Sequence, residues 1–150
     1  MSHTFTQLTY HAVFSTKERV NLITAELCPR LYPYIANIIN NGMGQMRNMG
    51  GTPNHLHILF DLHQSMAVAD AIRDIKSVSS GWVHDTFPRA KDFGWQEGYG
   101  AFSVSASAIP RVASYIQSQE KHHRRRSFEE EFVAFLDKHG IEYDPRYLWK

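Results

Sequence analysis

The segment from Asn54 to Leu62 constrains the fold of this chain more than any other. His55, His57 and Leu59 alternate with apolar residues at the even positions, and this period of two is typical of a β-strand with two different faces. We expect the even-numbered residues to pack against helices. His55 and His57 then project together from the other face, which places two possible metal ligands side by side without any loop.

The rest of the chain predicts an α+β fold around that strand. Alternation between Phe5 and Phe14 indicates another strand, and apolar stripes after Thr24 and Ser65 indicate two helices. A capping box that starts at Ser127 predicts the beginning of a later helix. The expected order is strand, helix, strand, strand, helix, strand, helix, helix, over residues 5–14, 24–39, 43–48, 55–62, 65–82, 96–105, 109–121 and 127–140.

This order is that of the ferredoxin-like split βαβ sandwich. In such a sandwich one antiparallel sheet carries helices on one face, and we expect the other face to be an open catalytic face from which His55 and His57 project. A length of 150 residues with 43% apolar content fits one domain over residues 1–150. Its last two helices occupy the region from about residue 109 to 150.

The number of cysteines and the N-terminal sequence indicate the cellular compartment of the protein. Cys28 is the sole cysteine, which excludes an internal disulfide and a cysteine-based zinc cluster and fits a reducing compartment. Met1 to Gln7 lacks the basic start and apolar stretch of a secretory signal. No uninterrupted apolar run approaches the roughly 20 residues that span a bilayer. The sequence therefore predicts a soluble cytoplasmic protein.

Tyr115 and Gln119 are four residues apart in the helix predicted over 109–121, so they share one face. At about 100° per residue, that face lies about 110° from the apolar stripe of the same helix. A tyrosine beside an apolar stripe often packs its ring in the core. Because Tyr115 lies on the polar side, we favour a chemical role for it.

These residue types suit the cleavage of a phosphodiester, whose negative charge repels nucleophiles. His55 and His57 can each donate a nitrogen lone pair to a divalent cation, and the side-chain oxygen of Gln119 can complete three protein ligands. The mixed nitrogen and oxygen donors suit Mg²⁺ or Mn²⁺. Beside such a cation Tyr115 becomes a better nucleophile, and its attack gives a covalent phosphotyrosine. That linkage conserves the bond energy, so the predicted chemistry is strand transfer and not simple hydrolysis.

Five segments spread over almost the whole chain form an ordered set of motifs: Tyr10–Lys17 (YHAVFSTK), Pro53–Leu59 (PNHLHIL), Trp95–Tyr99 (WQEGY), Tyr115–Gln119 (YIQSQ) and Asp144–Trp149 (DPRYLW). A lone His-x-His pair is a weak signal, whereas this ordered set is specific. The set resembles the single-tyrosine HUH transposases, the small family that moves insertion sequences as single-stranded DNA and that is related to the REP-associated tyrosine transposases.

The resemblance implies a role for each candidate residue. His55, His57 and Gln119 would be metal ligands, and Tyr115 would attack DNA and become linked to its 5′ phosphate. The expected substrate is single-stranded DNA with imperfect hairpins at element ends, in the nucleoid of a bacterial or archaeal cell. The resemblance also implies a homodimer, in which the tyrosine helix of one subunit completes the histidine site of the other. Residues 103–108 would be the joint that allows this exchange.

Other residues compete for these roles. Asp61 and His63 share the strand parity of His57, so either is an alternative to Gln119 as third ligand, although strand twist and distance disfavour them. His11 is expected on the same sheet face, where it is more typical of a polar strand residue than of a ligand.

Any contact with DNA has to come from local patches, because the formal net charge is only +1. The densest positive run directly follows the proposed nucleophile and predicts phosphate binding by Lys121, Arg124, Arg125 and Arg126. The alternative is a solvated helix end whose cations complement the helix dipole.

Four other functions remain open from the sequence. A domesticated relative could act on chromosomal repeat hairpins, or a replication initiator could use the same chemistry. A protein that binds hairpins without catalysis would keep the fold and the basic residues. A metal hydrolase that attacks with water would cleave DNA without any covalent adduct.

Overall fold

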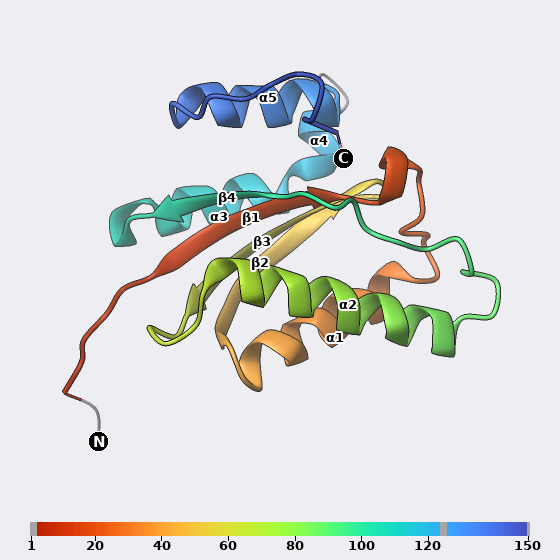
Figure 1. Ribbon diagram of the computed structural model, residues 1–150, viewed down its shortest axis with the longest axis horizontal. Coiled ribbons are helices and arrows are strands. Elements are labelled where there is room, and N and C mark those ends of the chain that lie inside the picture. The colour runs from red at the N-terminus through yellow and green to blue at the C-terminus, as the bar shows by residue number, and fades with distance from the viewer. Residues whose placement is uncertain (1–2, 124–125, 150) are drawn as a thin grey trace.

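The computed structural model describes residues 3–123 and 126–149, apart from the side chains of residues 120 and 122. Its elements form three layers, in which a central sheet lies between two groups of helices (Figure 1). The helices are α1 (Cys28–Asn40), α2 (Val68–Thr86), α3 (Ile109–Gln117), α4 (Gln119–His123) and α5 (Phe128–Lys138), with 3-10 turns at Lys17–Arg19 and Ala106–Ala108. No helix among these residues is long and apolar enough to span a membrane.

The sheet has four strands in the order β2-β3-β1-β4, and each neighbouring pair is antiparallel. The strands are β1 (Thr9–Ser15), β2 (Gly44–Thr52), β3 (His55–Leu62) and β4 (Gly100–Val104). The predicted α+β fold with an antiparallel sheet is therefore confirmed. β3 lies inside the sheet between β2 and β1, so hydrogen bonds on both sides fix the strand that carries the two histidines.

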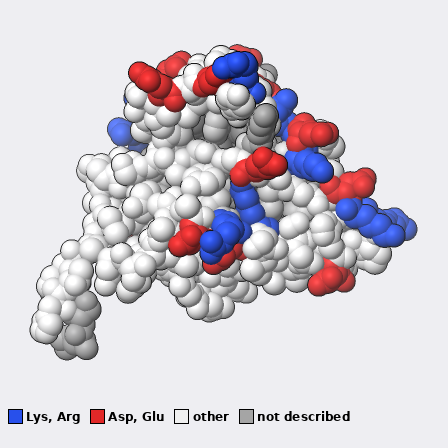
Figure 2. Space-filling model, viewed as in Figure 1, with Lys and Arg blue, Asp and Glu red and all other residues white. Residues whose placement is uncertain are grey.

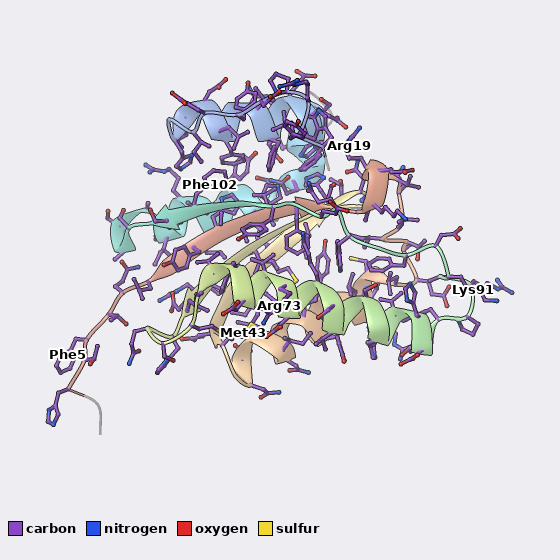
Figure 3. All side chains as sticks on the ribbon, viewed as in Figure 1. Phe5, Arg19, Met43, Arg73, Lys91 and Phe102 are labelled. Carbon is purple, nitrogen blue, oxygen red and sulfur yellow. The ribbon has the colours of Figure 1, made fainter. Side chains whose placement is uncertain are left out.

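Two strands are shorter than their patterns predict. β1 begins at Thr9. The chain before Gln7 extends away from the sheet and leaves Phe5 93% exposed (Figures 1 and 3). β4 begins at Gly100 instead of residue 96. The ammonium of Lys76 on α2 lies 2.8 Å from the carbonyl oxygen of Gln96 and 2.6 Å from that of Gly98. This contact holds the preceding segment as a loop against α2.

The even-numbered residues of β3 face α1 and α2, as the alternation predicts. They belong to a core that joins the sheet to both helices, and its fully buried members include Phe14, Leu31, Ile35, Ile39, Leu56, Ile58, Phe60, Ile72 and Ile75. This side of the sheet holds most of the buried apolar residues and gives β3 a fixed position.

The sheet face that we expected to be open is covered by α3, α4 and α5. Ile116 on α3 packs on Leu59 and Val104. Phe128 and Phe132 on α5 belong to a cluster with Val13 of β1 and Phe102 of β4. Figure 3 shows the side chains of α5 reaching down toward the sheet. The expectation of an open face was wrong for this chain because that face also carries apolar residues, which need a covering layer.

The helix predicted over 109–121 is interrupted. α3 ends at Gln117 and α4 begins at Gln119, with Ser118 between them at φ −105° and ψ 26°. The hydroxyl of Ser118 lies 3.1 Å from the carbonyl oxygen of Ser114, which competes with the regular helical pattern. Gln119 therefore starts a new helix and is not simply one turn beyond Tyr115.

Gly50 on β2 allows α3 to lie close to the sheet. A Cβ atom at this position would stand 2.5 Å from the backbone oxygen of Ile116. We expect Gly50→Ala to destabilise the fold by about 1–3 kcal/mol, because α3 must shift. Gly42→Ala is the matched control, since no atom lies within 4 Å of its Cβ position. Thermal unfolding of both variants tests this; equal melting temperatures would contradict it.

Candidate active site

His55 and His57 point from β3 into the space between the sheet and the C-terminal helices. Both are fully buried, and their ring centroids are 5.2 Å apart. The His55 ring stacks on Phe128 of α5, with 4.6 Å between centroids, and the His57 ring lies 5.9 Å from that of Tyr115. The structure thus brings the paired histidines and the candidate nucleophile together within one chain.

Neighbouring side chains orient the His55 ring. Its Nδ1 atom is 2.9 Å from Asn54 Oδ1 and 2.9 Å from Thr52 Oγ1. Its Nε2 atom faces the opposite way and is 3.2 Å from Gln119 Oε1. Partners of this kind fix the tautomer and the direction of a metal-binding imidazole. The Asn54 side chain, just before the histidine pair, therefore helps to fix the orientation of the His55 ring.

His11 on β1 orients the second ring. Its Nε2 atom is 2.8 Å from His57 Nδ1, and the two rings stack with centroids 5.0 Å apart. The Nε2 atom of His57 is left to face Glu131, whose Oε1 lies 3.0 Å away. We interpreted His11 from the sequence as an ordinary polar strand residue, but its side chain is only 3% exposed and supports the cluster directly.

Glu131 on α5 is the centre of the cluster, and the sequence reasoning missed it. Its Oε1 atom is 3.0 Å from His57 Nε2 and 3.6 Å from His55 Nε2, and its Oε2 atom is 3.2 Å from His123 Nε2. The side chain is 1% exposed. An acidic residue on the same helix face as Phe128 and Phe135 was the available signal.

The Tyr115 hydroxyl donates a hydrogen bond to Glu131 Oε2. Burial raises the pKa of Tyr115, and the hydrogen bond to Glu131 raises it further. Burial also acts to raise the pKa of Glu131, but hydrogen bonds with His123 and His57 outweigh it and leave the pKa below its usual value. The pair therefore consists of a neutral phenol and a carboxylate.

Gln119 reaches the same cluster from α4. Its Oε1 atom is 3.2 Å from His55 Nε2 and 3.0 Å from His123 Nε2, and the residue is 1% exposed. The predicted third ligand thus lies next to the histidine pair, although it belongs to the helix after the break at Ser118. His123, one turn further along α4, was not singled out from the sequence.

The donor atoms fit a divalent cation. Ligands at right angles on bonds of about 2.1 Å stand about 3.0 Å apart, and the contacts around the two Nε2 atoms are 3.0–3.6 Å. His55, His57, His123 and Glu131 hold ligand atoms within 4.8 Å of one another. Imidazole nitrogens and a carboxylate are ligand types that hold divalent cations in proteins.

Burial keeps the rings of His55 and His11 neutral. Burial lowers the pKa of His55 to about 3, and the charge of a neighbouring His57 acts in the same direction. The pKa of His11 is lowered to about 3 for the same two reasons. A neutral ring keeps the lone pair that binds a cation.

The sequence profile of the family described as "Transposase IS200 like" matches residues 4–119. This stretch is more than half of the chain and contains β1–β4, α3 and the candidate residues up to Gln119. The chain belongs to the IS200-like transposase family. Glu131, His123 and all of α5 lie beyond the matched stretch.

Known transposases agree with this assignment. The ISDra2 transposase TnpA of Deinococcus radiodurans is 25% identical over 118 residues, which cover 75% of this chain and 84% of that protein. A crystal structure described as a transposase from the same organism superposes with a TM-score of 0.62, at 21% identity, over 79% of this chain and 95% of that one. A REP-associated tyrosine transposase bound to a REP hairpin gives a TM-score of 0.59, at 15% identity, over 82% and 73%. The two superpositions show that the fold is shared.

Asp61 and His63, the two alternatives to Gln119 as third metal ligand, have other hydrogen-bond partners in this transposase. Asp61 Oδ1 is 2.7 Å from Arg47 Nε and 2.6 Å from Thr9 Oγ1. His63 Nδ1 is 2.7 Å from Ser65 Oγ at the exposed end of β3. Neither belongs to the cluster around the histidine pair.

Of the four predicted DNA-binding residues, the structure describes Lys121 and Arg126, and these two line different cavities. Lys121 is exposed and lines a cavity of about 650 Å³ beside Gln119, whereas Arg126 is exposed and lines a different cavity that contains Tyr115. Arg124 and Arg125 lie outside the described residues. Figure 2 shows cations and carboxylates mixed over α5 and α2 on the face in view.

Proposed function

We propose that this transposase cleaves and rejoins single-stranded DNA at hairpin ends through a covalent 5′-phosphotyrosine on Tyr115. One observation carries the proposal: a tyrosine hydroxyl, two oriented histidine nitrogens and buried oxygen donors meet in one cluster. Family membership supplies the reaction class, which is DNA transposition. The proposal treats residues 1–150 as one HUH domain that acts in the cytoplasm.

His55, His57 and Gln119 would hold the cation, and Glu131 offers one more oxygen ligand beside them. A bound Mg²⁺ or Mn²⁺ offsets the negative charge that grows on the phosphate as the bond is broken. Through their hydrogen bonds, His11 and Asn54 hold the His57 and His55 rings so that the Nε2 atoms face the oxygen atoms of Glu131 and Gln119.

Tyr115 then acts as the nucleophile. Its oxygen attacks the phosphorus, and its proton passes to the carboxylate of Glu131, which already accepts the hydrogen bond from that hydroxyl. The bond from phosphorus to the 3′ oxygen breaks, its electron pair stays on that oxygen, and a proton from solvent completes the free 3′ hydroxyl. Attack of a different 3′ hydroxyl on the phosphotyrosine reverses these steps and joins a new strand.

Single-stranded DNA with hairpins is the substrate that we infer. The REP-associated relative with the same fold was solved bound to a REP hairpin. A formal net charge of +1 also disfavours general binding of duplex DNA, so recognition would depend on local contacts and on the shape of the hairpin.

A labelled hairpin oligonucleotide tests the proposal. The protein is incubated with the oligonucleotide and Mg²⁺ or Mn²⁺, and a covalent adduct that survives denaturing electrophoresis is the expected result. Binding without an adduct would indicate a non-catalytic hairpin-binding protein, and cleavage without an adduct would indicate a hydrolase that uses water. Either of these results would overturn the proposal.

The proposed homodimer has its own prediction. If α3 of one subunit completes the histidine cluster of the other, a mixture of Tyr115→Phe and His57→Ala proteins regains activity, because one site then contains both native residues. If each chain uses its own Tyr115, the mixture stays inactive. The structure has Tyr115 beside the histidine pair of its own chain, so recovery requires that α3 is exchanged between the subunits. Complete exchange would restore roughly a quarter of the wild-type level, since random mixing makes half of the dimers mixed and each has one native site. Subunit exchange followed by the adduct assay measures this.

A further inference from the structure

The histidine cluster is closed to solvent on the side of the sheet. His55, His57, Gln119 and Glu131 are each at most 1% exposed. Tyr115 is only partly buried and offers a phosphate of DNA a way to the cluster. The surroundings of Tyr115 decide what can approach.

A cavity of about 280 Å³ opens beside Tyr115 between α3 and α5. Tyr115, Glu131 and His11 line it on the side of the cluster, and Val112, Ala134 and Phe135 supply apolar wall. This volume is slightly below the roughly 300 Å³ at which small-molecule sites begin. It suits a phosphate with part of the adjoining sugar and excludes a duplex.

Three cations line the same cavity. Arg111 lies on α3, Arg126 lies just before α5, and Lys138 is the last residue of α5, so they come from separate segments. All three are exposed, and no carboxylate forms a salt bridge with any of them among the described residues. Glu131 is the only acidic residue among those that line the cavity, and its oxygens already contact histidines and Tyr115.

We propose that this cavity binds phosphate groups of the single strand that is cut, with Arg111 and Lys138 as its cationic walls beside Arg126. This inference rests on the proposed function and adds the route and the residues by which the strand reaches Tyr115.

The helix positions explain why these residues converge. Glu131, Ala134, Phe135 and Lys138 are spaced three, four and seven residues along α5, so they share one face, and Arg111 is one turn before Tyr115 on α3. The other cavity near the cluster, beside Gln119, is lined by a single cation, Lys121, and includes neither Tyr115 nor Glu131. The cavity between α3 and α5 is therefore the better route for an anion.

Fluorescence anisotropy with a labelled single-stranded oligonucleotide tests the site. All variants are made in a Tyr115→Phe background, so that binding is measured without cleavage. We expect Arg111→Ala and Lys138→Ala each to weaken binding, and the double variant to raise the Kd about 5-fold or more. The slope of log K against log salt concentration should become less steep by about 0.7 for each phosphate contact removed. Arg111→Lys keeps the charge and should bind nearly as the parent does.

Lys91→Ala is the matched control, because it removes one positive charge from the loop between α2 and β4, far from α5 (Figure 3). Binding by the double variant equal to that of the control, with an unchanged salt slope, would overturn the site. The adduct assay on the wild type, with Tyr115 intact, keeps the two proposals apart. Absence of an adduct rejects the reaction, whereas loss of binding in the double variant still supports the phosphate site.

Discussion

Replacing Tyr115 by Phe will eliminate the covalent protein–DNA adduct. The change removes only the hydroxyl, which is the atom that would bond to phosphorus and which now donates to Glu131. We expect the yield of adduct to fall by about 10³-fold or more, because a lost nucleophile is not replaced by its neighbours. The measurement is denaturing electrophoresis of protein incubated with a labelled hairpin oligonucleotide and Mn²⁺.

A melting temperature and a control variant show whether the loss of adduct is specific to the Tyr115 hydroxyl. The phenylalanine ring can keep the contacts of the tyrosine ring with His57 and Phe135, so the melting temperature should stay close to that of the wild type. Tyr10→Phe removes a hydroxyl from the other face of the sheet, where the Tyr10 ring lies 6.2 Å from that of Phe60, and should leave the adduct intact. An adduct of undiminished yield with Tyr115→Phe would show that another residue attacks.

Replacing His57 by Ala will abolish the stabilisation of the protein by Mn²⁺ or Mg²⁺. Its Nε2 atom is one of the two nitrogens that converge on Glu131 Oε1, and alanine offers no donor in its place. A metal ion at 100 times its dissociation constant stabilises a fold by about 2.7 kcal/mol, which raises the melting temperature of a domain of this size by about 5–10 °C. We expect that rise in the wild type and almost none in His57→Ala.

The measured quantity is the difference between melting temperatures with and without the ion, because His57→Ala also leaves a cavity that lowers stability by itself. His63→Ala is the control. His63 follows β3, is exposed and contacts Ser65, so its loss should leave the effect of the ion unchanged. An equal response of both variants to Mn²⁺ would place the ion elsewhere.

The strand with the histidines was the part of the site that the sequence predicted best. Strict alternation over 55–62 determines which residues share a face, so the burial of Leu56 and the pairing of His55 with His57 both follow from a local pattern. Tyr115 and Gln119 were also found locally, from their spacing on a helix. Both reach the cluster, even though Ser118 breaks the helix between them.

Glu131 and the covered sheet face depend on long-range packing and were missed. Ser127 caps α5 as predicted, with its Oγ accepting a hydrogen bond from Glu130 N at 3.1 Å, but a capping box says nothing about where the helix packs. Glu131 gains its role only when α5 lies across the sheet, more than 70 residues along the chain from His57. The three cations of the cavity beside Tyr115 meet for the same reason.

Mass spectrometry of the protein–DNA adduct tests the central claim most directly. The protein is incubated with a hairpin oligonucleotide and Mn²⁺, digested with a protease and a nuclease, and the modified peptide is sequenced. We predict a nucleotide joined through its 5′ phosphate to the Tyr115 side chain. A nucleotide on any other residue, or cleaved DNA with both ends free and Tyr115 unmodified, would contradict the claim that this hydroxyl captures the DNA beside the histidine pair.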